Sequence, residues 1–265
     1  MYFIKSEKTP SELFCLEKII SEIESPQSTR LKLDLFPSLD STNQYLLNHI
    51  ADGRSPWAVL SEEQTAGRGR SGKSWHSTPG GSIALSLLWK FTSKAPVFSS
   101  LSIAVGVMII AALKKIVPNG LTLKWPNDIL YQSRKLAGIL LETKGSAVVI
   151  GIGLNTNLAS SSNKEWIGLS EIAEAPFSRN HIAGAIINQL LLQLPLYEAH
   201  GFRPFMSRFQ EYDFLAGKKI TLALPDKQII GVATGINHQG ELLLTDHTHK
   251  TRAYCYGEAS VLWEK

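Results

Sequence analysis

Cysteine is scarce in this sequence, and a long apolar run is missing. Only Cys15 and Cys255 occur among the 265 residues, and neither belongs to a CxxC pair. A disulfide framework is therefore not expected. The longest apolar run, 101–113, is shorter than the roughly 20 residues that a membrane-spanning helix needs. The first residues mix charges and have no apolar core, unlike a secretory signal. These absences predict a soluble, cytoplasmic protein with no membrane partner and with reduced thiols.

The sequence also has little excess of positive over negative charge, except in one short segment. The formal net charge is +4, with 19% charged and 44% hydrophobic residues, which is ordinary for a globular protein. Residues 1–30 hold 4 basic and 5 acidic side chains, whereas 64–76 hold Arg68, Arg70 and Lys73 and no acid. The basic concentration is thus an internal loop. A terminal DNA-binding arm is not predicted, and no DNA partner is expected.

Hydrophobic periodicity and turn residues predict an α+β protein with a mixed β-sheet. Helices are expected at 11–24, 40–50, 99–117, 178–194 and 202–210, and strands at 31–36, 57–61, 82–89, 121–125, 129–131, 136–142 and 147–154. A polar, serine-rich loop is expected at 159–164. After residue 215, short strands alternate with turns, which indicates a small β-barrel. We predict three parts: a short helical segment at 1–30, a large domain at 31–213 and a small one at 214–265.

The segment Gly67-Arg68-Gly69-Arg70-Ser71-Gly72 has the spacing GxGxxG. A dinucleotide-binding fingerprint lies between a strand and a helix, but Pro79-Gly80-Gly81 and a strand follow here, so that interpretation is rejected. Two arginines among glycines can instead hold a phosphate or carboxylate, although a solvated basic turn is the alternative. Trp75 either covers the ligand or belongs to the core.

Further along, Lys124-Trp125-Pro126-Asn127-Asp128 precedes a strand that carries Lys135 and Gly138. Lys135 is either a cation fixed opposite a carboxylate or a strand-end lysine with its ammonium group in water. Asn127 and Asp128 are either turn formers or ligands of a nucleotide or Mg²⁺.

Two other segments are candidates for ligand contacts. Ser41, Thr42 and Asn43 can cap a helix or line a pocket. The glycines of the strand 149–155 let a ligand lie against it, and Asn155 at its end can bind an adenine or ribose. His247 and His249 follow the turn residues Thr245-Asp246, and a solvated hairpin is favoured over a metal site.

In this order, these motifs resemble the bacterial biotin–protein ligase family, over about residue 31 to the C-terminus. The resemblance implies a catalytic domain like that of class II aminoacyl-tRNA synthetases at 31–213 and an SH3-like β-barrel at 214–265. It also implies that biotin and ATP form biotinyl-5'-AMP, with Mg²⁺, and that biotin then passes to a lysine of the biotin carboxyl carrier protein of acetyl-CoA carboxylase.

The resemblance assigns roles to individual residues. Arg68, Arg70 and Lys135 are the implied catalytic cations. The implied biotin-binding residues are Ser41, Thr42, Asn43, Gln64, Arg68, Gly69, Arg70, Lys135 and Gly138. The implied ATP-binding residues are Arg70, Trp75, Lys124, Asn127, Asp128 and Asn155, with Asp128 as the metal ligand.

Two competing functions are considered beside this one. A lipoate–protein ligase or related acyltransferase would share the fold, but the Gly-Arg-Gly-Arg loop speaks against it. Many family members are also repressors with an N-terminal winged helix, whereas residues 1–30 offer one helix with a net charge of −1. We therefore expect a monofunctional enzyme, with a ligand-dependent homodimer as a possibility.

Overall fold

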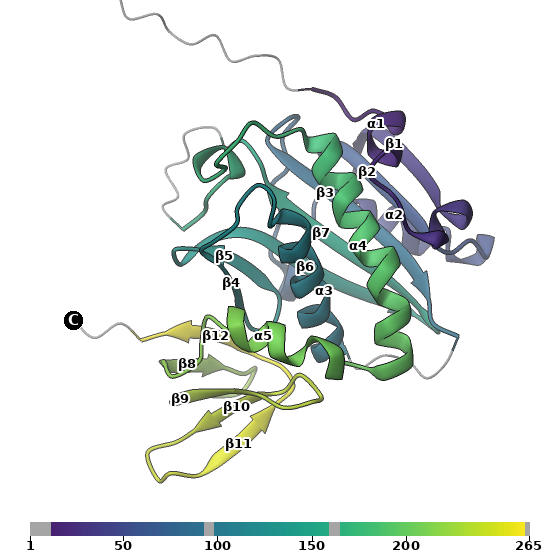
Figure 1. Ribbon diagram of the computed structural model, residues 1–265. Helices are drawn as coiled ribbons and strands as arrows, with labels where there is room; N and C mark the ends of the chain where they lie inside the picture. Colours follow the sequence, from purple (N-terminus) through teal and green to yellow (C-terminus); the bar gives the residue numbers. More distant parts are fainter. Residues whose placement is uncertain (1–11, 93–97, 159–164, 263–265) are drawn as a thin grey trace, which may run out of the picture.

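A seven-stranded sheet forms the centre of the computed structural model, which describes residues 12–92, 98–158 and 165–262 (Figure 1). The strand order is β1-β2-β3-β7-β6-β5-β4. The strands are β1 (Lys32–Leu39), β2 (Trp57–Gln64), β3 (Ser82–Lys90), β4 (Leu121–Lys124), β5 (Asp128–Tyr131), β6 (Arg134–Lys144) and β7 (Ala147–Asn155). Strands β1 and β2 are parallel and the other neighbours are antiparallel. The predicted mixed sheet is confirmed, and every predicted strand lies within or overlaps one of these.

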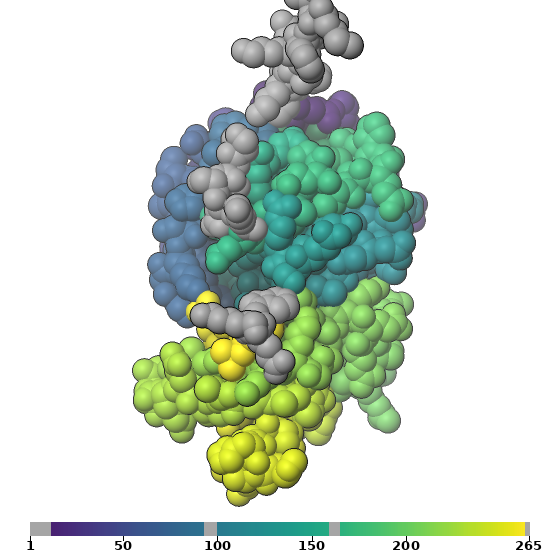
Figure 2. All heavy atoms as spheres, turned by 90° about the vertical axis from the view of Figure 1, so that its left-hand side faces the viewer, coloured from purple at the N-terminus to yellow at the C-terminus, as the bar shows by residue number. Residues whose placement is uncertain are grey.

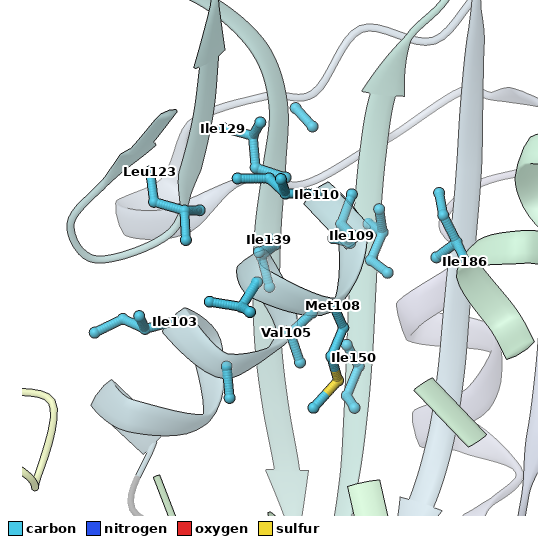
Figure 3. Close-up of a cluster of buried hydrophobic side chains, with 14 of the residues drawn as sticks. Ile103, Val105, Met108, Ile109, Ile110, Leu123, Ile129, Ile139, Ile150 and Ile186 are labelled. Carbon is cyan, nitrogen blue, oxygen red and sulfur yellow. The ribbon is translucent and has the colours of Figure 1, made fainter. Parts of the chain in front are cut away.

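Helices cover the two faces of the sheet unequally. The long helices α3 (Phe98–Leu113) and α4 (Arg179–His200) pack on one face (Figure 1), and α2 (Thr42–Asn48) contacts the other. Alternation along the strands explains this, because successive side chains point to opposite faces. In β2, Leu60 faces the large core while Val59 packs with Leu46 of α2. Figure 3 shows side chains of α3 meeting strand residues such as Ile139 and Ile150.

Helix α4 is longer than the sequence indicated, because it continues through Pro195 to His200. Proline removes a backbone donor and normally ends or kinks a helix. Here Leu194 and Tyr197, on either side of the proline, are both buried in the core. We attribute the continuation to this burial. The helix ends at Gly201, whose φ is +63°.

The predicted helix at 11–24 is wrong in extent. Helix α1 covers only Leu16–Ile20, and a 3₁₀ turn, η1, follows at Pro26–Arg30. Side chains of other elements take the backbone donors that a longer helix would use. The amide of Phe14 donates to Glu62, that of Cys15 to Asn180, and those of residues 24 and 25 to Asn188. The segment is thus held by tertiary contacts rather than by helix propensity.

The C-terminal part is a second, antiparallel sheet with the order β11-β10-β9-β8-β12. It follows η5 (Arg203–Phe205) and α5 (Met206–Tyr212) and comprises β8 (Lys219–Ala223), β9 (Gln228–Ile236), β10 (Leu242–Thr245), β11 (Thr251–Tyr254) and β12 (Glu258–Val261). Within the described residues, β11 and β12 do not pair, so the expected barrel is not closed. The sheet forms the lower part of the molecule in Figures 1 and 2. The boundary predicted at residue 213 stays a prediction.

Short 3₁₀ turns complete the fold at Ile50–Asp52 (η2), Arg70–Gly72 (η3) and Leu169–Glu171 (η4). The predicted loop at 159–164 lies outside the described residues. No helix in the described part of the chain is long and apolar enough to cross a membrane.

Candidate active site

A pocket opens beside the N-terminus of α2, on the face of the sheet opposite α3. Strands β6 and β7 form its floor, and the loop after β2 forms one side. Its walls are Ser41, Thr42, Asn43, Gln64, Arg68, Gly69, Arg70, Trp75, Leu85, Asn127, Lys135, Gly138, Ile139, Leu140, Gly151, Ile152 and Gly153. Segments far apart in the sequence thus meet at one cavity, as the resemblance implied.

Glycines on β7 let other parts of this protein lie directly on the sheet. A Cβ atom on Gly151 would come within 2.3 Å of the Asn43 side chain, and one on Gly153 within 2.3 Å of the Trp75 ring. Trp75 and Asn43 line the pocket as well. The glycines of this strand were predicted to let a ligand lie close to the backbone. In the structure, the side chains of Asn43 and Trp75 lie in these positions.

Both interpretations of Ser41, Thr42 and Asn43 are correct. The Ser41 hydroxyl accepts from the Gln44 amide as the N-cap of α2. All three residues are buried and line the pocket. Gln64 reaches them from β2, since its Oε1 accepts from the Thr42 backbone amide at 2.8 Å. The cap therefore positions the pocket wall.

The glycine–arginine loop is a folded hairpin over the pocket. Backbone bonds join Gly67 to Trp75 and Gly69 to Lys73. Only the 3₁₀ turn η3 occurs within it, with Ser71 at φ +54°, and a strand follows. The rejection of a dinucleotide fingerprint is confirmed, because the chain continues from this loop into strand β3 and not into an α-helix.

Side chains tie this loop to three other elements. Arg68 pairs with Glu142 of β6 at 2.9 Å, and Lys73 pairs with Glu258 of β12 at 2.5 Å. Arg70 donates to the Asn127 side chain at 3.1 Å. The Lys73 ammonium group lowers the pKa of the Glu258 carboxyl below its usual value. The C-terminal sheet therefore contacts the loop through an exposed ion pair.

Arg70 differs from the other two cations of the pocket. Arg68 has Glu142, and the Lys135 ammonium group lies 2.7 Å from Asp128 Oδ1. Arg70 forms no ion pair with a carboxylate among the described residues, and burial lowers the pKa of its guanidinium. A cation that is desolvated without a charged partner gains most from a bound anion. Arg70 is therefore the one of these three cations whose charge is not neutralised by a direct ion pair in the described part of the chain.

Lys135 lies at the start of β6, and glycine makes room for its side chain. A Cβ on Gly138 would come within 3.2 Å of the Lys135 ammonium nitrogen. The Asn155 side chain donates to the Lys135 carbonyl at 3.2 Å. The lysine's position is fixed, so it is not a strand-end residue with its ammonium group free in water. The close contact with Asp128 has poor hydrogen-bonding angles and acts as an ion pair.

Three predicted nucleotide ligands do not line this cavity, namely Lys124, Asp128 and Asn155. Asp128 and Asn155 support Lys135, whereas the charge of Lys124 acts on Glu258. The sequence prediction also missed Glu142 and Ser86, which hold wall residues from behind. Alternation along β6 places Glu142 on the same face as Gly138, and this was a usable signal.

Asp128 was predicted to hold a metal ion. No group of three or more His, Cys, Asp or Glu side chains suited to a metal occurs within the described ranges. Mg²⁺ does not need such a group, because it is commonly bound by one or two carboxylates together with substrate phosphates and water. The Asp128 carboxylate, which lies beside Lys135 of the pocket, fits that mode of binding.

Comparison with known proteins identifies the family. The sequence model of the Biotin/lipoate A/B protein ligase family matches residues 35–157. The fold resembles that of the Aquifex aeolicus biotin protein ligase in complex with biotin and ATP, with a TM-score of 0.78, 24% identity and coverage of 88% of this chain and 99% of that one. The structural match shows that the chain has the fold of a biotin protein ligase, and the family model covers the part of the chain that holds β1 to β7.

Two relatives narrow the class. The chain is 35% identical to the bifunctional ligase/repressor BirA of Escherichia coli (strain K12), over 89% of this chain and 74% of the relative. It is 33% identical to the biotin–[acetyl-CoA-carboxylase] ligase of Mycobacterium tuberculosis, over 80% of this chain and 83% of the relative. This chain belongs to the biotin–protein ligase family.

Proposed function

We propose that this protein is an ATP-dependent biotin–protein ligase. It forms biotinyl-5'-AMP from biotin and ATP, and then transfers the biotinyl group to a lysine of an acceptor protein. The observation that carries the proposal is the half-buried guanidinium of Arg70, which lines the pocket and forms no direct ion pair with a carboxylate in the described structure. A biotin carboxylate or an α-phosphate supplies the missing negative charge.

The first half-reaction brings two anions together. A carboxylate oxygen of biotin attacks the α-phosphorus of ATP, the P–O bond to the β-phosphate breaks, and pyrophosphate leaves. Arg70 and Lys135 offset the charge on the reacting groups, and this electrostatic positioning needs no protein nucleophile. Lys135 is set by Asp128 and Asn155, so its ammonium group stays directed at the site.

The catalytic role predicted for Arg68 stays a prediction, and its contacts suit an anchoring role as well. Its guanidinium is bound to Glu142, so it anchors the loop beside the biotin head group. Gly69 and Trp75 continue the loop over the pocket. Because the mixed anhydride would hydrolyse in water, a covering loop protects it. The folded hairpin seen here supports such a cover.

Asn127 and Asp128 lie at the nucleotide side of Lys135. Asp128 is the side chain that would hold Mg²⁺, with the phosphates of ATP as its other ligands. The ion would neutralise part of the triphosphate charge when bound. Asn127 orients Arg70. Lys124 and Asn155 are assigned to the nucleotide side with them.

The second half-reaction requires a neutral acceptor amine. The ε-amino group of the acceptor lysine attacks the acyl carbon, the bond to the phosphate oxygen breaks, and AMP leaves. We propose the biotin carboxyl carrier protein of acetyl-CoA carboxylase as acceptor, because a relative is named as the ligase for that carboxylase. Cytoplasmic location, ligand-dependent dimerisation and the absence of DNA binding stay predictions.

Isotope exchange tests the proposal. Incorporation of labelled pyrophosphate into ATP should require biotin and should not occur with lipoate in its place. Labelled biotin should then pass to a carrier domain that contains the acceptor lysine, and not to the same domain with that lysine changed to arginine. Exchange that is supported by lipoate and not by biotin would establish the competing lipoate–protein ligase.

A further inference from the structure

A continuous chain of polar side chains runs behind the pocket from Gln64 to Glu142. The contacts, in order, are Thr42 Oγ1 to Gln64 Oε1 at 3.0 Å, Thr42 Oγ1 to Ser86 Oγ at 2.7 Å, and Ser86 Oγ to Asn43 Oδ1 at 2.5 Å. Asn43 Nδ2 then donates to Glu142 Oε2 at 2.8 Å. The chain is mostly buried, since Thr42, Asn43 and Ser86 are each at most 4% exposed.

The direction of the Asn43 amide is set by the acceptors around it. Its Nδ2 group faces the Glu142 carboxylate and, at 3.3 Å, the Leu140 carbonyl. Neither of these groups can donate. The Asn43 Oδ1 atom must therefore face Ser86, and it can only accept. The proton of the Ser86 hydroxyl is consequently committed to Asn43.

The remaining hydrogen bonds follow from counting protons. Three oxygen-to-oxygen contacts join Gln64, Thr42, Ser86 and Asn43, but two hydroxyl groups supply only two protons. Because the Ser86 proton goes to Asn43, Thr42 Oγ1 receives no proton from Ser86, and Thr42 donates its own proton to Gln64 Oε1. The contact between Ser86 and Thr42 is the one left without a proton, so this lone pair of Thr42 Oγ1 is not used within the chain. Gln64 Oε1 still accepts from the Thr42 backbone amide.

We propose that Glu142 is a positioning residue that sets the direction of this chain and so presents Thr42 Oγ1 to the pocket as an acceptor. The inference rests on the proposed function, in which the head group of biotin occupies this end of the pocket. A cyclic urea carries N–H donors, which meet a lone pair at Thr42. The dithiolane ring of lipoate has no donor to offer there. Glu142 thereby contributes to selection of the ligand without touching it.

The Arg68 ion pair strengthens the same arrangement. Glu142 Oε2 accepts from Arg68 as well as from Asn43. The positive charge of Arg68 favours the ionised form of the Glu142 carboxylate. In that form Glu142 can only accept hydrogen bonds, so both Arg68 and Asn43 must donate to it. One carboxylate therefore links the loop that covers the pocket to the wall that recognises the head group.

The test compares Glu142→Met, which removes the acceptor, with Glu142→Gln, whose amide oxygen can still accept from Asn43. Glu142→Met should weaken biotin binding, measured by titration calorimetry, on the order of tenfold, the effect of one net hydrogen bond. Dethiobiotin, which keeps the urea, should lose affinity by the same factor, and Glu142→Gln should recover most of the loss. The KM for ATP in pyrophosphate exchange should stay unchanged.

A matched control and a double variant separate positioning from general damage. Glu241 also accepts from an asparagine amide, in the C-terminal sheet, and Glu241→Met should leave biotin affinity unchanged. In a Ser86→Ala background the relay is already broken, so adding Glu142→Met should cost little more. Equal biotin affinity in Glu142→Met and the unmodified protein would overturn the inference, as would additive losses in the double variant. Failure of the unmodified protein to bind biotin would instead overturn the proposed function.

Discussion

The buried ion pair between Arg179 and Glu62 offers the sharpest test of how the N-terminal segment is held. The side chains of Arg179 and Glu62 are only 4% and 9% exposed and lie 2.7 Å apart. Arg179 also donates to the carbonyls of Ser82 and Glu12, and Glu62 accepts from the Phe14 amide. The pair thus joins α4, β2, β3 and the segment before α1.

Replacing either Arg179 or Glu62 should lower the free energy of unfolding strongly, because the charge of the other residue then stays buried without a partner. Arg179→Met leaves the Glu62 carboxylate without its counterion and two backbone carbonyls without their donor. Breaking a buried pair from one side costs about 3–5 kcal/mol. At roughly 2–4 °C per kcal/mol for a chain of this size, the melting temperature should fall by about 6–20 °C. The exposed pair of Arg252 with Asp246, at 3.3 Å, is a matched control worth at most about 1 kcal/mol.

Chemical denaturation of Arg179→Met, Glu62→Gln, the double variant and Arg252→Met measures these differences. The double variant should lose less than the sum of the single losses, because neither charge is then left alone. If Arg179→Met unfolds within about 1 kcal/mol of the Arg252→Met control, the ion pair does not hold the segment. Additive losses would refute the coupling in the same way.

Three further predictions concern the site and the junction of the two sheets. Lys135→Met should fold normally, and its rate of biotin-dependent pyrophosphate exchange should fall by the equivalent of about 1.5–3 kcal/mol of transition-state binding. Lys144→Met, on the same strand, should keep the exchange rate of the unmodified protein. Equal exchange rates in the two variants would reject the role of Lys135. Lys73→Met should leave the melting temperature within about 2 °C, since its pair with Glu258 is exposed, and should speed proteolysis of the loop in the absence of biotin and ATP, as followed by mass spectrometry. Burial raises the pKa of Asp213, so the folded state binds this proton more tightly and stability falls as pH rises through the raised pKa. Asp213→Asn should therefore melt higher than the unmodified protein at pH 8, with a gap that shrinks towards pH 4; a gap that is independent of pH would contradict this.

The local sequence predicted the strands and the class of site well, since both depend on short-range chemistry. Alternating residues on β2 and β3 specify two buried faces whatever else surrounds them. The failure at residues 11–24 has the opposite cause. That segment has helical spacing, but its amides bond to Asn180 and Asn188, more than 160 residues away in the chain. Periodicity carries no information about such partners.

For the candidate site too, some features could be predicted from the sequence and others depend on the tertiary structure. The sequence by itself predicted that Arg68, Arg70, Lys135 and the residues after Asp40 belong to one site, because motif and order resemble the family, and these residues do line one pocket. Only the tertiary structure shows that the surroundings of the two arginines differ. Arg68 is neutralised by Glu142, whereas Arg70 is desolvated beside an amide. Pairing and desolvation depend on which groups lie within a few ångströms across strands, and the linear chain does not encode these distances directly.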